Sequence, residues 1–181
     1  MLDFGCQHRF VIQKHEADRA GLHHDLRIEV RNKDGECVLK SWATKSLEKL
    51  LAGKSEKVLL VPQIDHPLQW LHFKGEIAQG YGRGVVSIFD SGIFEVISQS
   101  DKVVTLKFNG KHLKGIYSIV FVDTDYNLLV KTKSIKKEDV TAVNTTTTVI
   151  PTPYNSPGRN PMRINRRKFR TVLLDKPESE D

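Results

Sequence analysis

One stretch of the chain, Leu22 to Val30, alternates between apolar and polar residues and carries the strongest structural constraint in the sequence. A period of two is typical of a β-strand with one face on a core and the other face polar. The aliphatic side chains from Leu26 onward take the first face. The stretch therefore predicts a strand whose polar face presents His23, Asp25 and Arg27 side by side.

This polar face has the composition of a phosphate-handling metal site. Side chains two residues apart on a strand are about 7 Å apart at Cα, so an imidazole and a carboxylate can bind one cation while the next guanidinium reaches an anion. His15, in an earlier segment, and His66, in a later one, are candidates to join them. Neutral imidazole with carboxylate suits Zn²⁺, Mn²⁺ or Fe²⁺ better than Ca²⁺. A solvated polar strand face without any site is the alternative that spacing alone leaves open.

The length and charge of the chain limit its architecture and its partners. Its 181 residues, 39% of them hydrophobic, suffice for one domain with a core plus a tail. The formal net charge of +6 favours polyanionic partners, because Lys and Arg side chains release counterions when they contact phosphates. We expect a monomer.

Three features indicate the compartment. No apolar run approaches the length of a membrane span, and the first ten residues lack the layout of a signal peptide. The two cysteines, Cys6 and Cys37, match neither a disulfide framework nor a zinc-binding spacing. We therefore expect a cytoplasmic protein without a membrane partner, in which both cysteines are ordinary thiols.

Short strands separated by polar turns dominate the first 130 residues. One short helix is expected, with Ser46 as its N-cap and Gly53 as its stop. The glycine-rich loop from Gly80 to Gly84 is expected to be a tight turn rather than a phosphate cradle, since no helix pattern follows it. Asn109-Gly110 predicts a hairpin with a return strand around residues 112–113. The other expected strands cover residues 10–13, 37–43, 58–61 ending at Pro62, 85–89, 93–97, 103–108, 116–122 and 127–131.

This pattern predicts an all-β fold, mainly an antiparallel closed β-barrel of about eight strands with one or two short helices. Closure leaves no unpaired edges and lets inward-facing residues of several strands meet. The barrel domain is expected to cover residues 1–132. Residues 133–181 are rich in Pro and Thr, and the stretch from Arg159 to Arg170 holds six basic residues and no acid. This irregular tail is interpreted either as a solvated end or as a nucleic-acid-binding arm that orders on contact.

Six blocks of sequence resemble, in the same order, the 3′-phosphoesterase domain of bacterial DNA ligase D and its stand-alone archaeal and bacterial relatives. The likeness covers roughly residues 8 to 132. The blocks are FVIQKH at 10–15, HHDLRIE at 23–29, VLKSWA at 38–43, DHPL at 65–68, GYGRGVVSIFDSG at 80–92 and LLVK at 128–131.

The resemblance implies a Mn²⁺-dependent β-barrel enzyme that heals 3′ ends of DNA or of primer strands carrying ribonucleotides, for use by a ligase or polymerase. In such enzymes a 3′-terminal ribonucleoside is removed to leave a 3′-phosphate, and the phosphate is then removed to leave a 3′-hydroxyl. The metal ligands of the family fall on His15, His23 and Asp25. The phosphate-contacting residues fall on Arg27 and on His66, which either donates a proton or stabilises the transition state.

Four departures from the family pattern concern ribonucleoside removal. Trp70 stands where a tyrosine is usual, Val58 where arginine is common, and Ile64 where an acid is expected. Only fourteen residues precede His15, fewer than in the ligase-linked domains. We therefore expect phosphomonoesterase chemistry more than ribonucleoside removal.

Three further residues are candidates for a supporting role: Lys57, which lies beside Val58, Trp70, and Glu29, which could orient Arg27 or a ligand histidine. Two rival interpretations remain at this stage. One is a catalytically impaired barrel that binds nucleic acid as a scaffold. The other is a metal-dependent phosphodiesterase for small nucleotides.

Overall fold

Antiparallel β-strands make up more than half of residues 1–132, which are the residues that the computed structural model describes. The predictions for the tail at 133–181 lie outside these residues. The helical segments are α1 (Leu47–Leu51) and the single 3₁₀ turn η1 (Leu68–Leu71). None of the helices in this part of the chain is long and apolar enough to cross a membrane. The strands are β1 (Arg9–Ala17), β2 (Gly21–Arg31), β3 (Cys37–Thr44), β4 (Lys57–His66), β5 (Gly75–Ile77), β6 (Gly84–Gln99), β7 (Val103–Asn109), β8 (Lys114–Phe121) and β9 (Asn127–Lys131).

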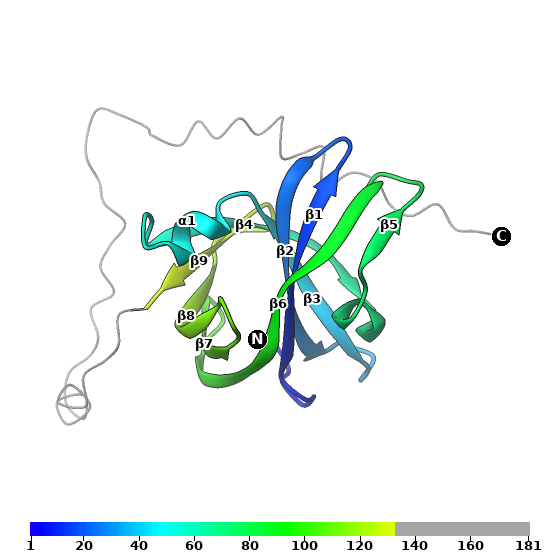
Figure 1. Cartoon of the computed structure of the whole chain (residues 1–181). Coiled ribbons are helices and arrows are strands. Elements are labelled where there is room, and N and C mark those ends of the chain that lie inside the picture. Colours follow the sequence, from blue (N-terminus) through cyan, green and yellow to red (C-terminus); the bar gives the residue numbers. More distant parts are fainter. Residues whose placement is uncertain (133–181) are drawn as a thin grey trace, which may run out of the picture.

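Eight of these strands close into a barrel, which confirms the predicted fold class. Their order is β1-β2-β3-β4-β9-β8-β7-β6, and β6 pairs with β1 to complete the ring. β5 is an additional strand that pairs with β6 (Figure 1). Each neighbouring pair is antiparallel, so the barrel is built from hairpins and from the longer connections around α1 and η1.

The interior of the barrel is an apolar core to which all eight strands contribute. Leu26, Ile28 and Val30 of β2 lie in this core, as their alternation predicted. Trp42 of β3 is also fully buried there, and α1 adds Leu47 and its neighbour Leu50. Each fully buried aliphatic side chain of this kind contributes about 2 kcal/mol to stability.

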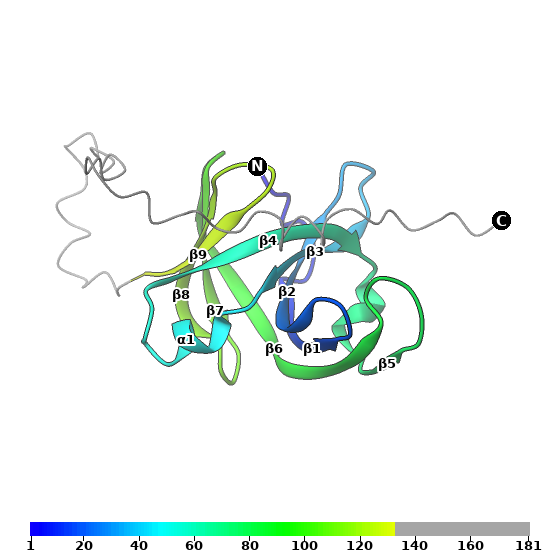
Figure 2. The ribbon, with the colours of Figure 1, turned by 90° about the horizontal axis from the view of Figure 1, so that it is seen from above.

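The polar face of β2 is on the outside of the barrel, yet it is buried as well. Every residue from 23 to 30 is buried, whereas a half-buried strand was expected. The segment between β4 and β6, which includes η1, lies beside β1 and β2 on the side away from α1 (Figure 2). Leu71 of this segment packs on Val11 and Leu39 in a second, smaller apolar cluster. The expectation that inward-facing residues would meet at the site is therefore wrong, because the interior is filled by apolar side chains.

Two predicted strands, 85–89 and 93–97, are halves of the single long strand β6. Gly92 between them is not a turn but pairs with Phe10 of β1. A Cβ at Gly92 would collide with the backbone oxygen of Asn109, so glycine is needed there for close strand approach.

The prediction for β4 was too short at its C-terminal end. β4 continues through Pro62, which pairs with Trp42, and reaches His66. A bulge between Leu39 and Ser41 of β3 shifts the register just beyond the proline, where strand irregularity tolerates a residue without an N–H. This extension brings His66 beside β3.

The predicted helix forms, but Ser46 makes no side-chain hydrogen bond at its N-terminus. The helix is held instead by its two buried leucines, Leu47 and Leu50. The helix prediction is therefore confirmed, and Ser46 occupies the predicted N-cap position without a capping hydrogen bond from its side chain.

The two cysteines form a disulfide, and the expectation of two free thiols is wrong. Cys6 and Cys37 are 31 residues apart in sequence and 6.1 Å apart at Cα. The N-terminal segment reaches β3 because Arg31, the residue that pairs with Cys37, donates its backbone N–H to Asp3 at 2.7 Å. The number of cysteines in the sequence does not reveal that these two distant residues lie close together.

The Asn109-Gly110 hairpin forms with a longer loop than predicted, and the return strand begins at Lys114 rather than around 112–113. Asp90 of β6 is the cause. Its carboxylate accepts the backbone N–H groups of Lys111 and His112, each at 2.8 Å, and of Leu113 at 2.6 Å. These N–H groups are thereby taken from the strand ladder, and residues 110–113 form a loop.

Substitution Asp90→Ala should destabilise the chain by about 3 kcal/mol, because three backbone N–H groups lose an ionised and buried acceptor. The measurement is urea unfolding at equilibrium, in which the midpoint should fall while the slope stays the same. Asp101→Ala, at an exposed position, is the control and should stay within about 0.5 kcal/mol of the wild type. An unchanged midpoint for Asp90→Ala would contradict this account of the loop.

Candidate metal and phosphate site

The β1–β2 hairpin brings His15, His23 and Asp25 together on the outer face of the barrel. His15 pairs directly with His23 across the two strands, and Asp25 follows His23 on the same face of β2. One ligand-type atom from each residue lies within 4.8 Å of the others. Asp25 Oδ2 is 3.6 Å from His15 Nδ1, and Asp25 Oδ1 is 3.5 Å from His23 Nε2. All three side chains are buried.

Backbone carbonyls fix the orientation of both imidazole rings. His15 Nε2 donates to the carbonyl of Gly82 at 2.8 Å, and His23 Nδ1 donates to the carbonyl of Gly21 at 2.9 Å. A carbonyl only accepts, so in the neutral rings His15 Nδ1 and His23 Nε2 keep their lone pairs. The predicted turn at Gly80 to Gly84 forms, and through Gly82 its role is to hold an imidazole.

The donor set fits a divalent transition-metal ion. In these tautomers two nitrogen lone pairs and the Asp25 carboxylate face one another without a proton between them. Asp25 Oδ1 is buried and has no hydrogen-bond partner among the described residues. A buried carboxylate oxygen without a partner is unfavourable, and a cation at this point would satisfy it. Two imidazoles with one carboxylate suit Zn²⁺, Mn²⁺ or Fe²⁺.

The surroundings of Asp25 keep its carboxylate ionised. Burial would raise its pKa, but the neighbouring side chains of His15, Arg27 and His23 together outweigh burial, and the pKa of Asp25 lies below its ordinary value. The carboxylate is therefore the negative group of the site at every pH near neutrality.

Arg27 is the next residue on the same face of β2, and its guanidinium is held on several sides. Nη2 donates to Asp25 Oδ2 at 3.2 Å, and Nε donates to Gln13 Oε1 at 2.8 Å. The guanidinium carbon lies 5.1 Å from the centre of the Trp70 ring. Burial lowers the pKa of Arg27, and Asp25 opposes this effect. The guanidinium remains a cation, because an arginine side chain loses its proton only far above neutral pH.

Gln13 is a site residue that the sequence interpretation missed. It is fully buried and pairs with Asp25 across the β1–β2 ladder. Its amide nitrogen donates to the carbonyls of Trp70 and Phe73, both at 2.9 Å, while its oxygen accepts from Arg27. Gln13 therefore connects the segment that contains Trp70 and Phe73 to the guanidinium of Arg27. The signal was present, since Gln13 is a polar residue two positions before His15 in an otherwise apolar run.

His66 at the end of β4 lies against Arg27. Arg27 Nη1 is 2.9 Å from His66 Nδ1, and the carbonyl of Ile64 is also 2.9 Å from that nitrogen. One nitrogen in a neutral ring is either a donor or an acceptor, and the guanidinium only donates. We therefore assign Nδ1 as the acceptor from Arg27 and the ring proton to Nε2. Burial and the charge of Arg27 lower the pKa of His66 to about 4, so the ring is neutral near pH 7.

The three supporting residues proposed from the sequence have different outcomes. Trp70 lies in the site, with its ring 5.1 Å from that of His66 and against Arg27. Glu29 is buried but accepts two hydrogen bonds from the guanidinium of Arg9, at 2.8 and 2.9 Å, and one from its backbone N–H, and orients neither Arg27 nor a ligand histidine. Lys57 lies at the opposite end of β4 from His66, where it pairs with Val130. The prediction of a supporting role is therefore wrong for Glu29, which binds Arg9 instead, and for Lys57, which lies at the far end of β4 from His66.

Protonation of His66 should destabilise the fold over a defined pH range. The ring is neutral above pH about 4 when folded, but only above its ordinary pKa of 6.5 when unfolded. As the pH falls from 6.5 to about 4, the unfolded chain therefore binds more protons and stability decreases. Unfolding measured with a chelator at several pH values should show this slope for the wild type and a smaller slope for His66→Gln. His72→Gln, at an exposed position, should keep the wild-type slope. Titration of the His66 ring near 6.5 by NMR would contradict the prediction.

Comparison with known proteins places this site in a family. A family model described as the DNA Ligase D 3′-phosphoesterase domain matches residues 13–121. This range contains every residue of the site, from Gln13 to Trp70.

Curated relatives agree with the family match. The multifunctional non-homologous end joining DNA repair protein LigD of Mycobacterium tuberculosis is 34% identical over 141 residues, which cover 75% of this chain and 17% of the relative. The corresponding protein of Mycolicibacterium smegmatis is 37% identical over 131 residues, covering 64% of this chain and 16% of the relative. That of Pseudomonas aeruginosa is 44% identical over 85 residues, covering 46% and 9%. The chain thus spans less than a fifth of the length of these relatives.

Proposed function

Since the chain belongs to the DNA ligase D 3′-phosphoesterase domain family, we propose that it is a metal-dependent phosphoesterase that removes 3′-phosphates from DNA or primer strands. The observation that carries the proposal is the row of groups along the outer face of β2. A three-ligand cluster at His15, His23 and Asp25 is followed directly by the buried cation Arg27, with neutral His66 against it.

His15, His23 and Asp25 are the residues that would hold the ion, for which we propose Mn²⁺ or another divalent transition metal. When bound, such an ion supplies Lewis-acid polarisation of a phosphoryl oxygen. The residues contribute orientation, because the carbonyls of Gly82 and Gly21 hold the two rings with their lone pairs toward Asp25.

Arg27 binds the oxygens of the phosphoryl group and offsets the negative charge that develops on them. Gln13 and Trp70 fix the guanidinium, so little reorganisation is needed when the phosphate arrives. His66 is neutral and carries its proton on Nε2 in the tautomer set by Arg27. It can therefore donate a hydrogen bond from Nε2 to an oxygen of the reacting phosphate and so stabilise the transition state.

Removal of the phosphate is better supported than removal of a 3′-terminal ribonucleoside. Val58 is buried in the barrel core, and Ile64 is 64% exposed, so neither position supplies the charged group expected of the family. These two substitutions also favour a second candidate, a barrel that binds 3′ ends without turnover. The indole of Trp70 donates but does not accept a hydrogen bond, unlike the tyrosine usual at this position.

A direct assay uses a duplex with a labelled 3′-phosphate end, incubated with the full chain and each divalent metal in turn. We expect release of inorganic phosphate with Mn²⁺ and none in chelator. A parallel duplex with a 3′-ribonucleotide end tests the second activity, for which we expect little turnover. Retained binding of the 3′-phosphate end without any turnover would select the binding module instead. If phosphate is released as expected, the resulting 3′-hydroxyl ends would be substrates for a ligase or polymerase.

Substitutions in the row should each abolish most of the activity. Asp25→Asn removes the negative ligand and Arg27→Met removes the phosphate-binding cation, and each should lower kcat at least about a hundredfold. Asp101→Asn, at an exposed position, is the matched control and should keep wild-type activity. Circular dichroism checks that the variants are folded. Full activity of folded Asp25→Asn would overturn the proposed mechanism.

A further inference from the structure

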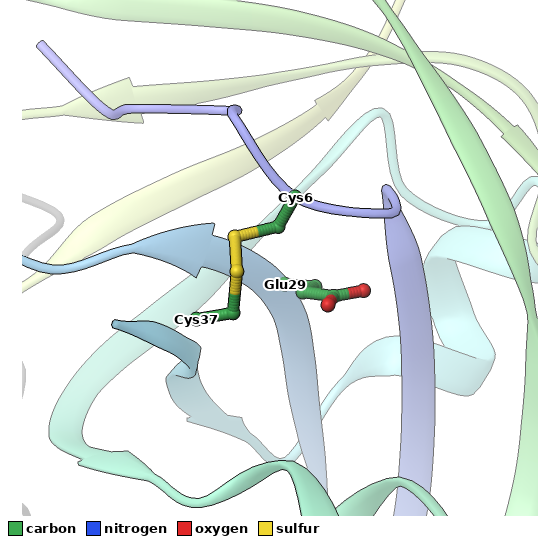
Figure 3. Close-up of side chains that lie close together, drawn as sticks. All are labelled: Cys6, Glu29 and Cys37. Atoms are coloured by element: carbon green, nitrogen blue, oxygen red, sulfur yellow. A yellow bond between two sulfur atoms is a disulfide. The ribbon is translucent and has the colours of Figure 1, made fainter. Parts of the chain in front are cut away.

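A second group of metal-ligand side chains lies farther along the outer face of β2. Glu29 is two residues beyond Arg27, and the disulfide between Cys6 and Cys37 lies beside it (Figure 3). One carboxylate oxygen and both sulfurs lie within 4.8 Å of one another. Glu29 is 1% exposed. The phosphate chemistry proposed above uses none of these three side chains.

The two sulfurs stay near each other for reasons independent of the covalent bond. Arg31 donates its backbone N–H to Asp3 at 2.7 Å and its side-chain Nη2 to the carbonyl of Gly5 at 2.6 Å. Leu2 exchanges two hydrogen bonds with the side chain of Gln99, at 2.9 and 3.0 Å. These contacts hold the residues just before Cys6, and β1, which begins at Arg9, fixes the chain just after it. Cys37 belongs to β3 and pairs with Arg31.

Disulfides are uncommon in reducing compartments. The reduced form of the chain, in which Cys6 and Cys37 are thiols, therefore has to be considered as well. Reduction by a phosphine, for example, breaks the S–S bond. Each sulfur gains one proton, and the phosphine is oxidised with the oxygen of a water molecule. The product has two thiols and a buried carboxylate within a few ångströms. Thiolate and carboxylate ligands in this number are typical of Zn²⁺ sites.

We propose that reduced Cys6 and Cys37, together with Glu29, form a second cation site that binds a thiophilic divalent ion such as Zn²⁺. Binding releases the two thiol protons. Arg9, which is hydrogen-bonded to Glu29, completes the charge balance, since the divalent ion and the guanidinium together offset two thiolates and one carboxylate. The described residues supply three ligands, which leaves a fourth position for water.

The disulfide and the bound ion are mutually exclusive, because each uses the same sulfur atoms. Either one bridges the N-terminal segment to β3. The chain therefore keeps that segment attached under oxidising conditions through a covalent bond, and under reducing conditions through the ion. This site is independent of the proposed phosphoesterase activity.

Cobalt(II) binding tests the proposal directly. The full chain, reduced anaerobically with a phosphine, is titrated with Co²⁺, and the near-ultraviolet charge-transfer band from thiolate to cobalt is recorded. The chain has only two cysteines, so such a band can come only from Cys6 and Cys37. Occupancy of the His15, His23 and Asp25 cluster gives no such band, because that cluster has no sulfur. Failure here is therefore distinguishable from failure of the proposed function.

We expect the band in the reduced chain, its absence in the oxidised chain, and its loss when Zn²⁺ displaces the cobalt. Cys6→Ser should weaken the band to about half and raise the dissociation constant. Glu29→Gln should keep the band but raise the dissociation constant about tenfold or more, as the loss of a ligand-orienting group already does. Zn²⁺ should also raise the Tm of the reduced chain more than that of Cys6→Ser.

Absence of the band in the reduced chain with excess Co²⁺ would overturn the proposal and leave a structural disulfide only. An undiminished band in Cys6→Ser, or an unchanged dissociation constant in folded Glu29→Gln, would overturn the three-ligand site.

Discussion

The buried carboxylate of Asp25 is the group on which the arrangement of the site depends. A charge in this position is unfavourable unless opposite charges or hydrogen-bond donors surround it. The surrounding groups come from two strands: His23 and Arg27 from the same strand as Asp25, and His15 from the neighbouring strand. The segment between β4 and β6 lies over this face, and Gln13 holds it through the backbone carbonyls of Trp70 and Phe73. The same segment therefore buries the charge of Asp25 and closes the site.

Part of this arrangement was predictable from the sequence because it depends on the local period of a strand. Alternation placed His23, Asp25 and Arg27 on one face, and a hairpin partner carrying His15 lies next to them by register. Alternation does not state whether the polar face points into the barrel or away from it. That choice depends on apolar residues from all eight strands, which fill the interior. It also depends on η1, whose Leu71 covers the outer face.

Interactions between distant segments account for the predictions that failed. Glu29 shares the outer face with Arg27, but Arg9 of the neighbouring strand binds both of its oxygens. Asp90 determines where β8 begins, although it lies more than twenty residues before the loop that it organises. Cys6 reaches Cys37 only because the N-terminal segment pairs with Arg31. None of these contacts has a signature in local spacing, whereas the family resemblance carried the positions of His15 and His66 directly.

Two arginines on neighbouring strands, Arg9 of β1 and Arg27 of β2, bind carboxylates on the outer face of β2, and these partners decide which arginine is available to a substrate. Arg9 donates from Nε and Nη2 to Glu29, a carboxylate that faces no imidazole in the site, so this pair is neutral. Arg27 shares its carboxylate with two imidazoles. With a divalent ion bound to Asp25, the ion, the carboxylate and the Arg27 guanidinium would carry a net charge of about +2, which follows from counting their formal charges. A terminal phosphate carries about −1.5 to −2 near neutral pH, whereas a phosphodiester carries about −1. Charge balance in this site therefore favours a terminal monoester over an internal diester, which agrees with a preference for 3′-phosphate removal.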